Sequence, residues 1–65
     1  MSDLHQRAVE EIRWLSLGKS AAEIAEIMGV NKWTVQVDLR NAKEATGSAT
    51  ACALVAHCLR EGIIR

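Results

Sequence analysis

The segment AEIMGVNKWTV, residues 25–35, decides the fold. Ala25 is a small residue that stands where two packed helices would touch. Gly29 can turn the backbone through a positive φ, which glycine adopts without a steric penalty. Val35 supplies the apolar contact by which a following helix docks back. This spacing predicts a helix-turn-helix, and the other apolar positions that fit the motif are Ile24, Val30 and Leu39. Two packed helices that contact no nucleic acid are the alternative.

Capping residues outline the two helices of this motif. Ser20-Ala21-Ala22-Glu23 has the pattern of a capping box, so a helix is expected at about residues 20–28. Asn31 is a good N-cap for the next helix, predicted from roughly Lys32 to Ala45 and stopped by Thr46-Gly47. The residues predicted to face inward are Ala21, Ile24, Ala25 and Met28 on the earlier helix, and Val35, Leu39, Ala42 and Thr46 on the later one.

A helix is predicted on each side of this pair. The first runs from about Leu4 to Leu17, with Ser2 or Asp3 as its cap and Gly18 at its end. The last begins after Ser48 or Thr50 and occupies about residues 49–61. Residues 1–65 are therefore expected to form a single all-α domain of four helices. The inward residues are Leu4, Ala8, Ile12 and Leu15 on the first helix, and Ala51, Leu54, Val55 and Cys58 on the last.

Composition excludes several classes of protein. The 65 residues are nearly half apolar and a quarter charged, which is typical of a globular chain with a limited core. The two cysteines stand six positions apart and point in different directions on one helix, so they indicate a reducing cytoplasm and no disulfide. His57 and these two cysteines do not lie on one side of a helix at this spacing, so they are not expected to bind a metal. We find no catalytic constellation, no cofactor motif and no apolar run long enough for a membrane.

A helical wheel places a DNA-reading surface opposite the inward side of the third helix. Arg40 can form bidentate bonds with guanine, Gln36 can read adenine, and Val37 can meet a thymine methyl group. Trp33 can pack along the sugar-phosphate edge, or serve as a hydrophobic lid or protein contact. An ordinary solvated helix face is the alternative for Arg40 and Lys43. The residues expected to hold phosphates are Lys19, Ser20, Lys32, Thr34 and Lys43.

Charge is the weak point of this interpretation. Eight basic and eight acidic residues cancel, whereas DNA-binding modules usually carry a basic surplus. Asp38 even places a carboxylate within the third helix. The wheel puts it near the core boundary, where it is expected to bond a backbone group or a Lys or Arg of the first two helices. The supposed DNA face carries four cations, Lys19, Lys32, Arg40 and Lys43, and one carboxylate, Glu44. Because so few cations neutralise phosphates, we expect a monomer to bind DNA weakly and in a salt-sensitive way.

The chain resembles the LuxR/GerE-type DNA-binding domain over essentially its whole length. The resemblance implies a four-helix domain that binds promoter DNA as a homodimer, with its third helix in the major groove and its fourth aiding dimerisation. Cys52, Ala56 and Leu59 lie beside the inward stripe of the fourth helix and could meet a second copy, or belong to one core. The resemblance rests on Leu4-x-x-Arg7, Arg13-Trp14-Leu15, Gly18-Lys19-Ser20, residues 23–30, Thr34-Val35, residues 39–42 and Gly62-Ile63-Ile64; Trp14 and Asn41-Ala42 are typical of the quorum-sensing branch.

Several positions depart from the family pattern. Ala8 replaces a glutamate, and Glu11 replaces an apolar residue on the inward stripe. One hypothesis is that Glu11 stands in for the missing carboxylate and pairs with a basic residue on another helix; the other is a partly exposed Glu at a loose edge. The remaining changes each remove positive charge or a core leucine: Asp38 for histidine, Ala45-Thr46 for Lys-Leu, and Ala51 for arginine.

Two functions therefore stand open. The first is a cytoplasmic transcription regulator, or its isolated DNA-binding domain, that reads double-stranded DNA as a homodimer without a cofactor. The second is a small protein-binding module, or anti-activator, that pairs with a larger LuxR-type regulator through the fourth helix and does not bind DNA itself. Neither function involves a membrane.

Overall fold

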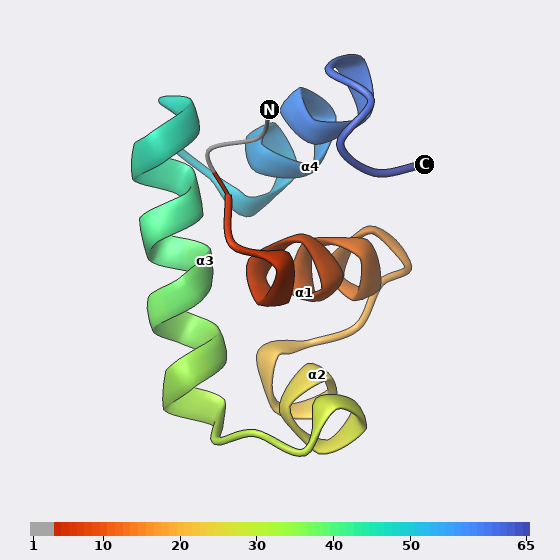
Figure 1. Cartoon of the computed structure of the whole chain (residues 1–65), viewed down its shortest axis with the longest axis vertical. Coiled ribbons are helices and arrows are strands. Elements are labelled where there is room, and N and C mark those ends of the chain that lie inside the picture. The colour runs from red at the N-terminus through yellow and green to blue at the C-terminus, as the bar shows by residue number, and fades with distance from the viewer. Residues whose placement is uncertain (1–3) are drawn as a thin grey trace.

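Four helices make up the part of the chain that the computed structural model describes, residues 4–65. They are α1 (Gln6–Ser16), α2 (Ala21–Met28), α3 (Lys32–Thr46) and α4 (Ala51–Arg60). None of these residues lies in a strand. Figure 1 shows α3 along one side of the molecule, with α4, α1 and α2 stacked in that order beside it. The predicted all-α, four-helix architecture is confirmed.

The start and the end of α2 have the expected construction. The Ser20 hydroxyl accepts from the backbone N–H of Glu23 at 3.2 Å, and the Glu23 carboxylate accepts from the backbone N–H of Ser20 at 2.9 Å. Gly29 ends α2 with φ 68°, where L side chains are disfavoured. Ala25 and Val35 are buried, so the helix-turn-helix spacing is confirmed.

The core consists of two clusters on the inner side of α3. Ile24 and Ala25 of α2 pack against Val35 in the first cluster. The second joins α1, α3 and α4, and its buried members are Ile12, Ala42, Leu54, Cys58 and Ile64. Leu39 packs against both clusters and so connects them. The inner side of α3 therefore packs against the other helices, and its opposite side faces outward.

Several details differ from the sequence predictions. α1 ends at Ser16 rather than Leu17, and α4 occupies Ala51–Arg60 rather than about residues 49–61. α1 begins at Gln6 rather than Leu4, and its N-cap is His5, which makes no side-chain capping bond; the predicted caps Ser2 and Asp3 lie outside the described residues. α3 extends one residue beyond the predicted Ala45, to Thr46. Ala51 is exposed rather than packed, because it is the first residue of α4 and the buried stripe starts at Leu54.

Candidate nucleic-acid interface

The exposed side of α3 is the candidate interface. The Asn31 side chain caps the helix by accepting from the backbone N–H of Trp33 at 2.7 Å, which holds the first turn in place. Trp33 is 68% exposed, and Gln36 and Arg40 are also exposed. No other helix covers this side of α3 in Figure 1. The surface that the helical wheel assigned to DNA is therefore open among residues 4–65.

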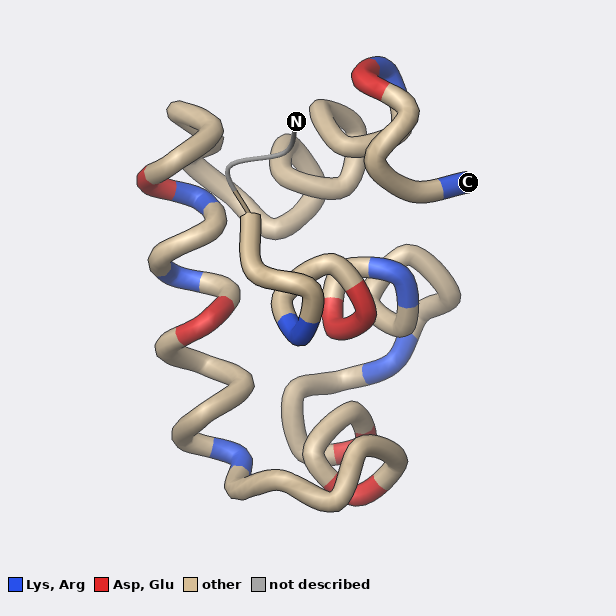
Figure 2. The backbone as a smooth tube through the Cα atoms, viewed as in Figure 1, with Lys and Arg blue, Asp and Glu red and all other residues tan. Residues whose placement is uncertain are grey.

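The other residues predicted to contact DNA lie around this surface. Figure 2 shows basic positions near the start, middle and end of α3, and one more on the segment between α1 and α2. Lys32 and Ser20 are exposed. The partly buried members of the predicted set are Lys19, Thr34, Val37 and Lys43. Partial burial of the Lys19 and Lys43 stems leaves their ammonium groups able to reach a ligand.

The cations of this surface form no ion pair within residues 4–65. The only ion pair in the described part of the chain joins Arg7 to Asp38. Lys32, Arg40 and Lys43 consequently have no carboxylate partner there. Glu44 is exposed near the end of α3 and is the one acidic side chain of the outer surface. A zero net charge over the whole chain is thus compatible with three free cations on α3.

Asp38 is turned toward α1 rather than toward the outer surface of α3. The Arg7 guanidinium donates from Nε to Asp38 Oδ2 at 2.6 Å and from Nη2 to Oδ1 at 3.0 Å. This bidentate bond lowers the pKa of the Asp38 carboxyl below its usual value, and the carboxylate in turn raises the pKa of Arg7. The prediction that Asp38 bonds a basic residue of the first two helices is confirmed.

Glu11 behaves unlike either hypothesis about it. Its side chain is 0% exposed, and neither carboxyl oxygen has a hydrogen-bond partner in residues 4–65. Both hypotheses are wrong, because Glu11 pairs with no basic residue of another helix and is not at a loose edge. Arg7 was not predicted as the partner of Asp38. Its position four residues before Glu11 places it on the same side of α1, but the sequence gives no crossing geometry that would pair it with a residue of α3.

The predicted dimer surface on α4 lies outside the core. Leu59 is 49% exposed, and Cys52 and Ala56 are exposed as well. These residues therefore do not belong to the single core that was the alternative. Leu54 and Cys58 form the buried side of α4, and burial raises the pKa of the Cys58 thiol. The exposed stripe is free to meet another surface.

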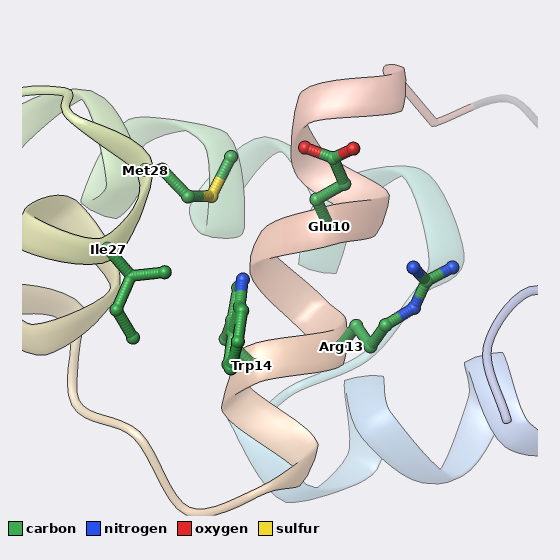
Figure 3. Close-up of a pocket in the computed structure, with 5 residues that line it drawn as sticks. All are labelled: Glu10, Arg13, Trp14, Ile27 and Met28. Carbon is green, nitrogen blue, oxygen red and sulfur yellow. The ribbon is translucent and has the colours of Figure 1, made fainter.

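A shallow groove between α1 and α2 lies apart from α3. Figure 3 shows Trp14 facing Ile27 and Met28, with Glu10 and Arg13 along α1 at its edge. Trp14 is half-buried and packs against the cluster that joins α2 to α3, so its main role here is to hold α2 in place. No three His, Cys, Asp or Glu residues of the described chain gather as a metal site.

The length of the helices bears on membrane insertion. None of the helices in residues 4–65 is both long and apolar enough to cross a bilayer.

The turn at Gly29, the burial of Ala25 and Val35, and the exposed outer side of α3 together define a four-helix helix-turn-helix domain. Comparison with known proteins extends this conclusion. The chain is 41% identical over 61 residues to the "HTH-type quorum sensing-dependent transcriptional regulator VjbR" of Brucella ovis, and equally to that of Brucella abortus. The chain is accordingly a LuxR/GerE-type helix-turn-helix domain, similar to domains of the quorum-sensing branch.

The match with the Brucella regulators covers very different shares of the two proteins. It covers 94% of this chain but 24% of each relative, so the chain spans about a quarter of the length of the curated relatives it matches. No family model and no solved structure matches the chain. The names of the relatives describe transcriptional regulators, which agrees with the prediction that this chain is not an enzyme.

Proposed function

We propose that this chain is a transcription regulator, or the DNA-binding domain of one, and that α3 reads promoter DNA in the major groove. The observation that carries the proposal is the open outer side of α3. Trp33, Gln36 and Arg40 are exposed there, while Asp38 is bonded to Arg7 behind them. The similarity to regulators of the quorum-sensing branch supports the same function.

Residues of α3 have different tasks in this proposal. Arg40 bonds a guanine edge, Gln36 an adenine edge, and Val37 a thymine methyl group. Trp33, at the start of α3, packs along the sugar-phosphate edge. Five residues hold phosphates and set the register of the helix on the duplex: Lys19, Ser20, Lys32, Thr34 and Lys43.

Two copies bind together in the proposed complex. Cations that neutralise phosphates give each copy modest affinity, which falls as salt rises. A homodimer through Cys52, Ala56 and Leu59 of α4 joins two half-sites and increases the affinity of the pair. We place this complex in the cytoplasm.

A salt-series binding assay on promoter fragments tests the proposal. Arg40→Ala should weaken binding through the lost base contact, by about 1–3 kcal/mol. Lys43→Ala should reduce the slope of log affinity against log salt by about one. Arg13→Ala removes the same charge from an exposed residue of α1 and is the matched control. Equal effects of all three substitutions would contradict the proposal.

The rival function is a protein-binding module that pairs with a larger LuxR-type regulator. A carboxylate on the third helix and a zero net charge both favour this function. The bonds from Arg7 turn the Asp38 carboxylate away from the outer side of α3, which weakens the first of these arguments. The parent protein is the chain without substitutions. If it shows no affinity for any duplex at low salt, even as a dimer, it is a protein-binding module and does not read DNA.

A further inference from the structure

Three side chains meet where α1 packs against α3. Arg7 and Glu11 come from α1, four residues apart, and Asp38 comes from the middle of α3. Arg7 is half exposed at the rim of this contact, and the Asp38 side chain is 11% exposed. Glu11 is fully enclosed behind them. A movement of Asp38 relative to α1 would also move Arg40, because both belong to one rigid helix.

Glu11 is the unusual member of this cluster. An ionised carboxylate that is buried without a hydrogen bond is costly, and Asp38 beside it already carries a negative charge. Burial, and then the neighbouring Asp38, raise the pKa of Glu11 to about 8, and the Arg7 charge only partly opposes them. A protonated Glu11 has an O–H that can donate to the Asp38 carboxylate.

Other charged groups near α1 do not change this assignment. α1 packs against α2, α3 and α4. The charges that act on Glu11 are those of Asp38 and Arg7, and His5 acts on Asp38. None of the titratable side chains on α2 and α4 is a hydrogen-bond partner of Glu11: Glu23, Glu26, His57, Arg60 and the two cysteines.

We propose that Arg7 and Glu11 are positioning residues, which hold α3 through Asp38 in the orientation that presents its outer side to DNA, with Glu11 in its protonated form. Arg7 fixes one side of the Asp38 carboxylate through two bonds, and the Glu11 O–H occupies a remaining lone pair. The DNA part of this inference rests on the proposed function, whereas the protonation of Glu11 can be tested without DNA.

The sign of the pH effect follows from linkage. The pKa of Glu11 is higher in the folded protein, about 8, than its ordinary value of 4.5. Between these values only the folded state holds the proton, so the Glu11 contribution to stability falls as pH rises. The pKa of Asp38 is instead lower in the folded protein than its ordinary value of 3.8. The contribution of Asp38 to stability is therefore lost only when the pH falls below 3.8. Loss of the Glu11 proton should loosen α3 as pH rises through about 8.

The DNA-free experiment measures the unfolding midpoint in denaturant from about pH 5 to about pH 9. The parent should lose stability across this range, whereas Glu11→Gln, which cannot ionise, should remain nearly flat. Glu10→Gln, the same change at the adjacent exposed residue, should retain the slope of the parent. A parent curve without a slope, or an unchanged slope in Glu11→Gln, overturns the proposal.

The DNA experiment uses Asp38→Asn. A charge effect and a positioning effect predict opposite changes in the DNA affinity of this variant. Removing a negative charge near DNA should tighten binding if charge alone matters. Loss of positioning should instead weaken binding by about fivefold or more, the usual scale of coupling between sites. The salt slope should stay unchanged, because Asp38 contacts no phosphate in the proposed complex. Tighter binding by a folded Asp38→Asn protein would contradict the positioning role.

The two proposals fail in different ways. If the parent binds no duplex, the proposed function fails, and the unfolding series still decides whether Glu11 holds a proton against Asp38. If the parent binds DNA but Glu11→Gln leaves the pH dependence of both stability and affinity unchanged, positioning by Glu11 fails alone. Amide NMR shifts of α3 in the DNA-free Asp38→Asn protein report whether the helix has moved without being unfolded.

Discussion

The carboxylate of Asp38 lies on the helix that is proposed to read DNA, yet both of its oxygens are bonded to Arg7. Its position near the core boundary could be read from the helical wheel, and so could a basic partner in the first two helices. The identity of that partner could not, because a wheel gives directions around one helix and no crossing geometry between two. The burial of Glu11 against the same contact was missed for this reason.

A stability prediction at the residue scale concerns Glu11→Leu. Removing a buried polar group that has no hydrogen bond should raise the free energy of unfolding by roughly 1–3 kcal/mol at about pH 9. At about pH 5 the substitution should bring no gain, because the protonated Glu11 of the unsubstituted protein donates a hydrogen bond to Asp38 in the proposed arrangement. Denaturant unfolding at both pH values measures the difference.

Glu10→Leu is the control for this substitution, because Glu10 is exposed and adjacent. It should change the stability little at either pH. A loss of stability in Glu11→Leu at about pH 9 would show that the Glu11 carboxylate has a favourable partner, contrary to its surroundings in residues 4–65.

Helix ends account for most of what the sequence predicted at the scale of elements. The capping box at Ser20, the Asn31 cap and the Thr50 cap are all present, and Gly29 and Gly47 both adopt the left-handed conformation. Each of these caps is a local interaction, so it can be read from nearby residues. The start of α1 was misplaced because the inward stripe includes Leu4, which packs against the core from outside the helix.

Asn31→Ala tests the contribution of capping to the candidate interface. Loss of the bond to the backbone N–H of Trp33 should lower stability by about 1 kcal/mol and fray the first turn of α3. Asn41→Ala is the matched control, because Asn41 is exposed within α3 and Ala is the better helix former. Thermal unfolding should give shifts of opposite sign. Equal losses in both variants would mean that the Asn31 cap contributes nothing specific.

The arrangement of the whole molecule explains how a chain of zero net charge can present a basic surface. Two clusters on the inner side of α3 bind it to the other helices, and Leu39 connects them. The one ion pair of residues 4–65 lies on that inner side, so the cations of the outer side remain free. The apolar positions could be predicted from their spacing. The burial of Ile64 within the α1–α3–α4 cluster depends on tertiary packing and could not.

Dimerisation is a prediction for the assembled molecule. Leu59→Glu places a charge within the exposed stripe of α4 and should shift the protein from dimer to monomer in sedimentation experiments. Ala53→Glu introduces the same charge at an exposed position on another side of α4. It should leave the dimer intact. A parent that is monomeric at all concentrations, with and without DNA, would rule out the α4 homodimer.

The central claim is that the outer side of α3 meets DNA, and the two tryptophans allow a direct measurement. Trp33 is exposed on that side, whereas Trp14 is half-buried between α1 and α2. In an NMR titration with a short duplex at low salt, the indole N–H of Trp33 and the amides of Gln36 and Arg40 should shift together, while the Trp14 indole stays in place. Shifts at Trp14 or along α4 with α3 unchanged would contradict the account.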